Sequence, residues 1–234
     1  SDPITGYSFD LSYRLNNRIT LYSQFAQLMG ETRELGEDFR KNLGFGIVPI
    51  GISGRVGPID LRAEFRKSTR NFIFNYWDRS YDVNRIVYVD SILITKESEL
   101  YNYGSMQGIY GELSSNIFNF ATLGLGYQHL NGEQWDKNAN NYIDDSNRSF
   151  LATMQINTSI IPRLKTAKMF YQQSNVPNPF KFNPSASTIS GYDLGIELSN
   201  GMMLIYKSRT TYIDNGNGLE SVKSANFETQ ILFN

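Results

Sequence analysis

The stretch that decides the fold class is IDLRAEFR, at residues 59–66. It alternates four apolar residues with four charged ones: Ile59, Asp60, Leu61, Arg62, Ala63, Glu64, Phe65 and Arg66. Successive side chains of a β-strand point to opposite faces, whereas a helix would mix the two sets on every face. The stretch therefore predicts a strand with one apolar face and one ionic face.

The same two-residue period recurs along most of the chain. It predicts about eleven strands, at residues 7–15, 19–25, 43–55, 59–66, 109–113, 121–127, 150–156, 167–171, 192–198, 204–209 and 227–233. The content of 15 Tyr, 15 Phe and 19 Gly agrees, because aromatic side chains suit a pleated sheet and glycine tolerates the positive φ of tight turns. We expect an all-β chain.

The links between the predicted strands are of two kinds that alternate. Short links lie at 16–17, 56–58, 116–119, 160–163 and 199–201, and long polar links lie at 29–41, 69–103, 130–148, 174–187 and 214–223. Outer-membrane barrels have short periplasmic turns and longer outer loops, whereas a soluble sandwich has no reason to sort its loops in this way. The pattern predicts an antiparallel up-and-down transmembrane β-barrel of about 11–12 strands, forming one domain over residues 1–234. The alternative is a soluble β-barrel or sandwich that acts as a binding module and buries its apolar face.

In this pattern the chain resembles a Gram-negative outer-membrane β-barrel over nearly its whole length. Its closing residues, Phe227-x-Thr229-x-Ile231-x-Phe233, are similar to the C-terminal assembly signal of such barrels, although Asn234 follows the aromatic residue that usually ends the signal. The resemblance implies a location in the bacterial outer membrane, contact with outer-membrane lipid, and a role as a small porin-like channel or as an anchor for surface loops. Another outer-membrane or surface protein would then be contacted through the long loops.

The odd number of predicted strands has two explanations. Single-chain bacterial barrels normally have an even count, so we expect one further strand before Tyr7, which would make this chain the C-terminal part of a longer barrel. Alternatively, residues 86–95 form a membrane strand. The aromatic-rich segment 71–90 is expected to be a β-hairpin outside the membrane, with covering of the barrel mouth or contact with a partner as alternatives.

A membrane barrel reverses the two faces of a soluble sheet, because lipid contacts its apolar face and the lumen contacts its polar face. The residues predicted to line the lumen are Asp60, Arg62, Glu64, Arg66, Asp193, Glu197, Lys207, Arg209 and Glu228. They would form either the wall of an aqueous channel or mutual ion pairs that fill the lumen. Aromatic residues near strand ends are expected at the membrane interfaces: Tyr7, Tyr127, Trp135, Tyr171 and Phe233.

The composition excludes several other classes of protein. With 22 Lys+Arg against 23 Asp+Glu the net charge is −1, so the positive charge that neutralises nucleic-acid phosphates is missing. The absence of cysteine excludes a disulfide scaffold, a cysteine-ligated metal and a thiolate nucleophile. No apolar run approaches the roughly 18 residues of a membrane-spanning helix.

The sharpest local motif lies after the strand that ends near Tyr127. Its spacing matches that of an EF-hand-type Ca²⁺ loop, with side-chain oxygens from Asp136, Asn138, Asn140 and Asp144 and a backbone carbonyl from Tyr142. Asn141 stands where glycine is usual and Asn147 where a bidentate glutamate is usual, so we expect weak affinity. The alternative is a polar turn without metal, since Asn and Asp are common turn residues.

The only histidine, His129, is the one candidate for catalysis. It is similar to the rim histidine of outer-membrane lipid hydrolases, which is followed closely by a serine nucleophile. Asn131 stands in place of that serine, and a histidine without a nucleophile in reach is no catalytic centre. We therefore expect no enzyme activity, and a rim lipid hydrolase using His129 remains the second alternative.

Overall fold

The computed structural model describes residues 4–33, 40–77, 86–89, 92–199, 201–214 and 218–231. Most of these residues lie in antiparallel strands, which confirms the all-β prediction. The largest sheet has eleven strands, in the order β1-β2-β5-β6-β9-β10-β11-β12-β13-β14-β15. The order follows the sequence, so each strand neighbours the strands before and after it in the sheet, as the up-and-down prediction requires.

The strands of the large sheet are β1 (Thr5–Arg14), β2 (Ile19–Met29), β5 (Phe45–Val56), β6 (Ile59–Ser68), β9 (Tyr103–Ile117), β10 (Ala121–Asp136), β11 (Asn141–Ile156), β12 (Leu164–Gln173), β13 (Thr188–Ser199), β14 (Met202–Asp214) and β15 (Leu219–Ile231). Two small antiparallel pairs lie outside it: β3 (Glu31–Arg33) with β4 (Arg40–Asn42), and β7 (Ile86–Val89) with β8 (Ile92–Thr95). The short helical segments are α2 (Lys96–Glu99), η1 (Leu100–Asn102), η2 (Thr158–Ile160) and η3 (Pro179–Lys181).

Residues 86–95 belong to the β7–β8 hairpin and not to the large sheet. The idea that they form a membrane strand is therefore wrong, and the hairpin interpretation is confirmed for this part of segment 71–90. Earlier in that segment, Phe72 and Tyr76 pack in a buried apolar cluster with Leu28, Leu43 and Leu100. These two aromatic side chains are therefore part of a buried core cluster.

Two of the predicted long loops are wrong. In place of a loop at 130–148, β10 and β11 extend until only residues 137–140 separate them. In place of a loop at 214–223, only residues 215–218 separate β14 from β15. The physical reason is that ladder hydrogen bonds come from the backbone, so a polar segment can pair as well as an apolar one.

The short link before β6 is confirmed as the turn at Gly57 and Pro58, where Gly57 has φ of 60°, a value that glycine adopts without strain.

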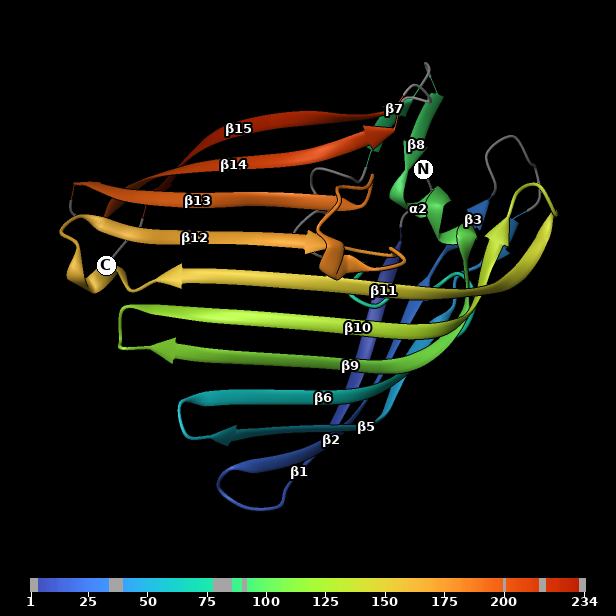
Figure 1. Cartoon of the computed structure of the whole chain (residues 1–234), viewed down its shortest axis with the longest axis horizontal. Helices are drawn as coiled ribbons and strands as arrows, with labels where there is room; N and C mark the ends of the chain where they lie inside the picture. The colour runs from blue at the N-terminus through green and yellow to red at the C-terminus, as the bar shows by residue number, and fades with distance from the viewer. Residues whose placement is uncertain are drawn as a thin grey trace. The chain divides into compact units, whose positions relative to one another are not determined.

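The chain divides into two compact units, which are described separately below. Unit 1 comprises Ser1–Gly54, Arg62–Tyr110 and Gln128–Asn147, and unit 2 comprises Arg55–Leu61, Gly111–Tyr127 and Arg148–Asn234. In unit 2, β12 to β15 run side by side as an antiparallel series (Figure 1). The last strand ends at Ile231, so the predicted interfacial residue Phe233 lies outside the described residues. Among the described helices, none is long and apolar enough to cross a membrane.

Candidate functional site

The apolar face of β6 is exposed and its ionic face is buried. Leu61 and Phe65 are 44% and 39% exposed, whereas Glu64 and Arg66 are 4% and 5% exposed. A strand at the surface of a water-soluble sheet has the opposite arrangement, because apolar side chains leave water and charges stay in it. The predicted alternation is thus present, and the side that leaves solvent is the charged one.

The same inversion occurs in unit 2. Along β13 the exposed positions are the apolar ones, Tyr192, Leu194, Ile196 and Leu198, and the positions between them are less accessible. Aromatic rings also form a ladder across the neighbouring strands, with ring centroids 5.9 Å apart for Tyr192 and Tyr206 and 5.0 Å apart for Tyr206 and Phe227. Tyr192 and Phe227 are exposed and Tyr206 is half-buried, so the three rings form an apolar row across β13, β14 and β15.

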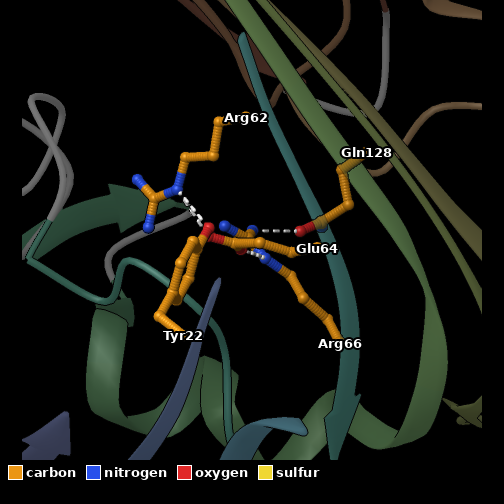
Figure 2. Close-up of polar contacts among 5 residues, drawn as sticks. All are labelled: Tyr22, Arg62, Glu64, Arg66 and Gln128. Carbon is orange, nitrogen blue, oxygen red and sulfur yellow. Dashed lines mark hydrogen bonds and ion pairs between the residues drawn. The ribbon is translucent and has the colours of Figure 1, made fainter. Parts of the chain in front are cut away.

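The buried charges of unit 1 form a connected cluster around Glu64, which we call the Glu64 cluster (Figure 2). The hydroxyl of Tyr22 donates to Glu64 Oε1 at 2.7 Å, and Arg66 Nε donates to Glu64 Oε2 at 2.6 Å. Arg62 Nε lies 2.6 Å from Glu64 Oε1 and also donates to the Tyr22 hydroxyl at 2.8 Å. The Glu64 side chain has no exposed surface, so its desolvation is offset by two guanidinium groups and one hydroxyl.

Arg66 links this cluster to other strands of unit 1. Its Nη1 donates to Gln128 Oε1 of β10 at 2.8 Å, and its guanidinium carbon lies 3.7 Å from the ring centroid of Tyr110 in β9. A second ring, that of Phe74, lies 5.0 Å away. Stacking on aromatic faces suits a planar, weakly hydrated guanidinium, so the buried cation is held by a carboxylate, an amide and two rings.

Sequence reasoning missed Tyr22, Gln128 and Tyr110 as members of this site. Tyr22 lies directly across from Gly51 on β5, and a Cβ at Gly51 would be 2.4 Å from the tyrosine ring. Glycine therefore leaves the space in which the ring reaches Glu64. The available signal was the position of Tyr22 in its strand: it lies between Leu21 and Ser23 and therefore shares a face with Gln24 and not with the apolar Leu21 and Phe25.

The remaining predicted lumen residues form ion pairs within unit 2. Their nitrogen–oxygen distances are 2.7 Å for Arg209 with Asp193, 2.7 Å for Lys207 with Glu228, 2.8 Å for Lys165 with Glu197 and 2.6 Å for Arg55 with Asp60. The first pair is the most enclosed, with side chains 15% and 23% exposed, and the last is the most open, at 68% and 49%. All nine predicted lumen residues thus pair with an opposite charge, and Lys165 and Arg55 were not foreseen as partners.

The predicted calcium ligands fall on the hairpin between β10 and β11. Asp136 ends β10, and its Oδ1 accepts from the backbone amides of Asn138 at 2.7 Å and Ala139 at 3.3 Å. Asn140 has φ of 46° in the turn, and Tyr142 and Asp144 already belong to β11. No group of three or more acidic, histidine or cysteine side chains suited to a metal occurs among the described residues. Calcium binding here stays a prediction.

His129 lies on β10 next to Gln128, which reaches Arg66. Because neighbouring residues of a strand point to opposite faces, His129 is on the face away from the Glu64 cluster. Two residues further along the same face stands Asn131, as the sequence indicated. The histidine and the buried charges are therefore not parts of one site.

The expected interfacial aromatic residues have different surroundings. Tyr7 is 53% exposed and its ring centroid is 6.1 Å from that of Phe25. Tyr127 stacks on Phe180 of η3 at 5.3 Å. Trp135 instead packs edge-on against Tyr101 in unit 1.

The sequence matches no protein-family model, and no curated protein matches it either. Among solved structures, the chain is similar to the NanC porin in a rhombohedral crystal form, with 10% sequence identity over 99% of each chain and a TM-score of 0.40. A likeness this distant leaves the function to be argued from the residues of this chain.

Proposed function

We propose that this protein is a bacterial outer-membrane β-barrel whose sheet closes on itself and forms a small, porin-like channel. Lipid would cover the apolar face of the strands, and the charged face would line the lumen. The observation that carries the proposal is the inversion of the two faces, with Leu61 and Ile196 exposed while Glu64 and Arg66 are buried.

The inversion favours hydrocarbon over water as the surrounding medium. Exposed apolar surface is unfavourable in water by roughly 25 cal/mol per Å² and is favourable in lipid. A strand can cross a bilayer only if its backbone N–H and C=O groups are hydrogen-bonded, and pairing with neighbouring strands of a sheet provides those bonds. The runner-up, a soluble module with a buried apolar face, is opposed by β13, where Ile196 and Leu198 are 48% and 52% exposed while the positions between the apolar residues are less accessible.

The choice of a channel over a plain membrane anchor rests on the Glu64 cluster. Two guanidinium groups and one carboxylate give it a net charge of +1, and Arg62 is its most accessible charged member, with 38% of its side chain exposed. A charged group that faces water in a lumen biases which ions pass. We therefore propose a water-filled passage whose wall includes Arg62, with a preference for anions.

Two measurements test the proposal in sequence. The first is extraction of the expressed protein from bacterial membranes: we expect it in the outer-membrane fraction, resistant to alkaline carbonate and released by detergent. A monomer that stays in solution without detergent would overturn the membrane assignment.

The second measurement is single-channel conductance in planar lipid bilayers. We expect discrete conductance steps whose anion preference is reduced by Arg62→Gln. The matched control is Lys67→Gln, an exposed lysine of the same strand with the opposite parity, which should leave the preference unchanged. A membrane-inserted protein without conductance steps would be an anchor for surface loops, and the channel would be refuted.

A further inference from the structure

Three aromatic rings of unit 1 form the walls of a small box, which we call the aromatic box. It consists of Tyr101 in η1, Trp135 near the end of β10 and Tyr142 near the start of β11. The ring centroids of Tyr101 and Trp135 are 5.0 Å apart at an interplanar angle of 80°, and those of Trp135 and Tyr142 are 5.1 Å apart at 71°. Successive rings therefore meet edge to face, nearly at right angles, and do not stack face on face.

Hydrogen bonds fix the position of one wall. The Tyr142 hydroxyl donates to the backbone carbonyl of Tyr101 at 3.0 Å, so two walls are tied together across a long stretch of sequence. The guanidinium carbon of Arg70 lies 4.1 Å from the Tyr142 ring centroid, and Arg70 is paired with Glu133 at 2.9 Å. Tyr142 is therefore held by contacts that do not involve Lys41.

The occupant is the ammonium group of Lys41, on β4. Its nitrogen lies 4.1 Å from the ring centroid of Tyr101, 5.2 Å from that of Trp135 and 5.4 Å from that of Tyr142. All three distances are within the range of about 6 Å for cation–π attraction. In the described part of the chain, no carboxylate pairs with Lys41 and no oxygen accepts its N–H groups.

This combination points to a ligand better suited to the box than lysine. A primary ammonium carries three N–H donors that prefer oxygen acceptors, and the faces of the rings, against which Lys41 lies, offer none. A quaternary ammonium has no N–H to satisfy and spreads its charge over methyl groups, which is the chemistry that aromatic cages recognise. Its transfer into the box would leave no donor without a partner.

We propose that the aromatic box is a binding site for organic cations of the quaternary ammonium class, and that Lys41 is a tethered competitor for it. A free ligand binds when the Lys41 side chain swings out. The site does not depend on whether the sheet spans a membrane, because all its members belong to unit 1.

The test uses choline as the probe and Trp135 as the reporter. The chain has two tryptophans, so the full-length protein carrying Trp77→Phe has Trp135 as its only indole; we call this variant the parent. Choline should quench its fluorescence saturably at high concentration. Adding Lys41→Gln removes the competitor, and we expect the half-saturating concentration to fall about tenfold, by the strength of one cation–π contact.

Three controls separate a cation site from other causes of quenching. The neutral isostere 3,3-dimethyl-1-butanol should have no effect, Lys41→Arg should bind choline as weakly as the parent, and Lys67→Gln should behave like the parent. Lys41→Met serves in place of Lys41→Gln if circular dichroism shows that the latter has lost its strands. Any of three results would overturn the proposal and show that Lys41 only packs β4 against the rings. The first is equal choline affinity with and without the Lys41 charge. The others are equal quenching by the isostere and a parent whose fluorescence does not change with choline.

Discussion

The replacement Glu64→Gln should destabilise the protein strongly, although it changes the side chain by one atom. Glu64 is fully enclosed and accepts from Tyr22 and Arg66 at 2.7 Å and 2.6 Å. A glutamine keeps one acceptor oxygen and turns the other position into a donor. Its N–H₂ group would then face Arg66 Nε on one side or Arg62 Nε on the other, and guanidinium nitrogens only donate. Arg66, whose side chain is 6% exposed, is then left without its counter-ion.

The expected loss follows from that enclosure. Removing one partner of a buried ion pair costs about 3–5 kcal/mol, because the remaining charge is neither hydrated nor paired. A second change, Glu64→Gln with Arg66→Gln, should recover part of this loss, since no buried charge remains. Non-additivity of this kind is expected for residues in one network.

Equilibrium urea unfolding in non-ionic detergent micelles, followed by tryptophan fluorescence, measures the effect. The matched control is Asp60→Asn. Asp60 lies on β6, as Glu64 does, and the change removes one charge from its open pair with Arg55 of β5; exposed pairs contribute little. If Glu64→Gln unfolds at the same urea concentration as Asp60→Asn, the Glu64 cluster is not a stabilising network and the reasoning fails.

Three further predictions concern other parts of the chain. Ile196→Arg, on the exposed apolar face of β13, should weaken folding into lipid vesicles by about 2–4 kcal/mol if this face meets the bilayer midplane; a soluble protein would tolerate the change, so normal folding would count against the membrane assignment. Arg209→Gln should lower the urea midpoint more than Lys207→Gln, because the Arg209–Asp193 pair is the more enclosed; the reverse order would mean that burial does not rank these pairs. Calorimetric titration with Ca²⁺ should give a heat of binding that Asp136→Asn abolishes. If no heat is measured at millimolar Ca²⁺, the predicted calcium loop is refuted.

Much of the large sheet could be predicted from the sequence. The strand around Phe65 and the one around Leu194 were found because alternation is a property of consecutive residues. The errors fell where that signal is weak. Residues 130–148 and 214–223 are mostly polar and lack a sustained two-residue alternation, so the pattern does not separate a paired strand from a loop there. The expected further strand before Tyr7 stays a prediction.

The candidate site was predictable only in part. The sequence placed Glu64 and Arg66 on one ionic face, and the structure has both there. It could not supply Tyr22, which is 42 residues from Glu64, or Gln128, which is 62 residues from Arg66. Such partners depend on strand register and on the space left by Gly51, neither of which is a local property of the chain.

The alternation in the sequence was enough to establish strands with one apolar and one ionic face, because each side chain's direction follows from its place in the strand. Which of those faces is withdrawn from solvent was decided by the tertiary structure alone, since burial depends on what packs opposite a residue. The same holds for the aromatic box, which brings Lys41, Tyr101 and Trp135 together from three separate segments. The alternation of residues along a strand determines the face on which a side chain lies, and packing between segments distant in sequence determines which residues it contacts.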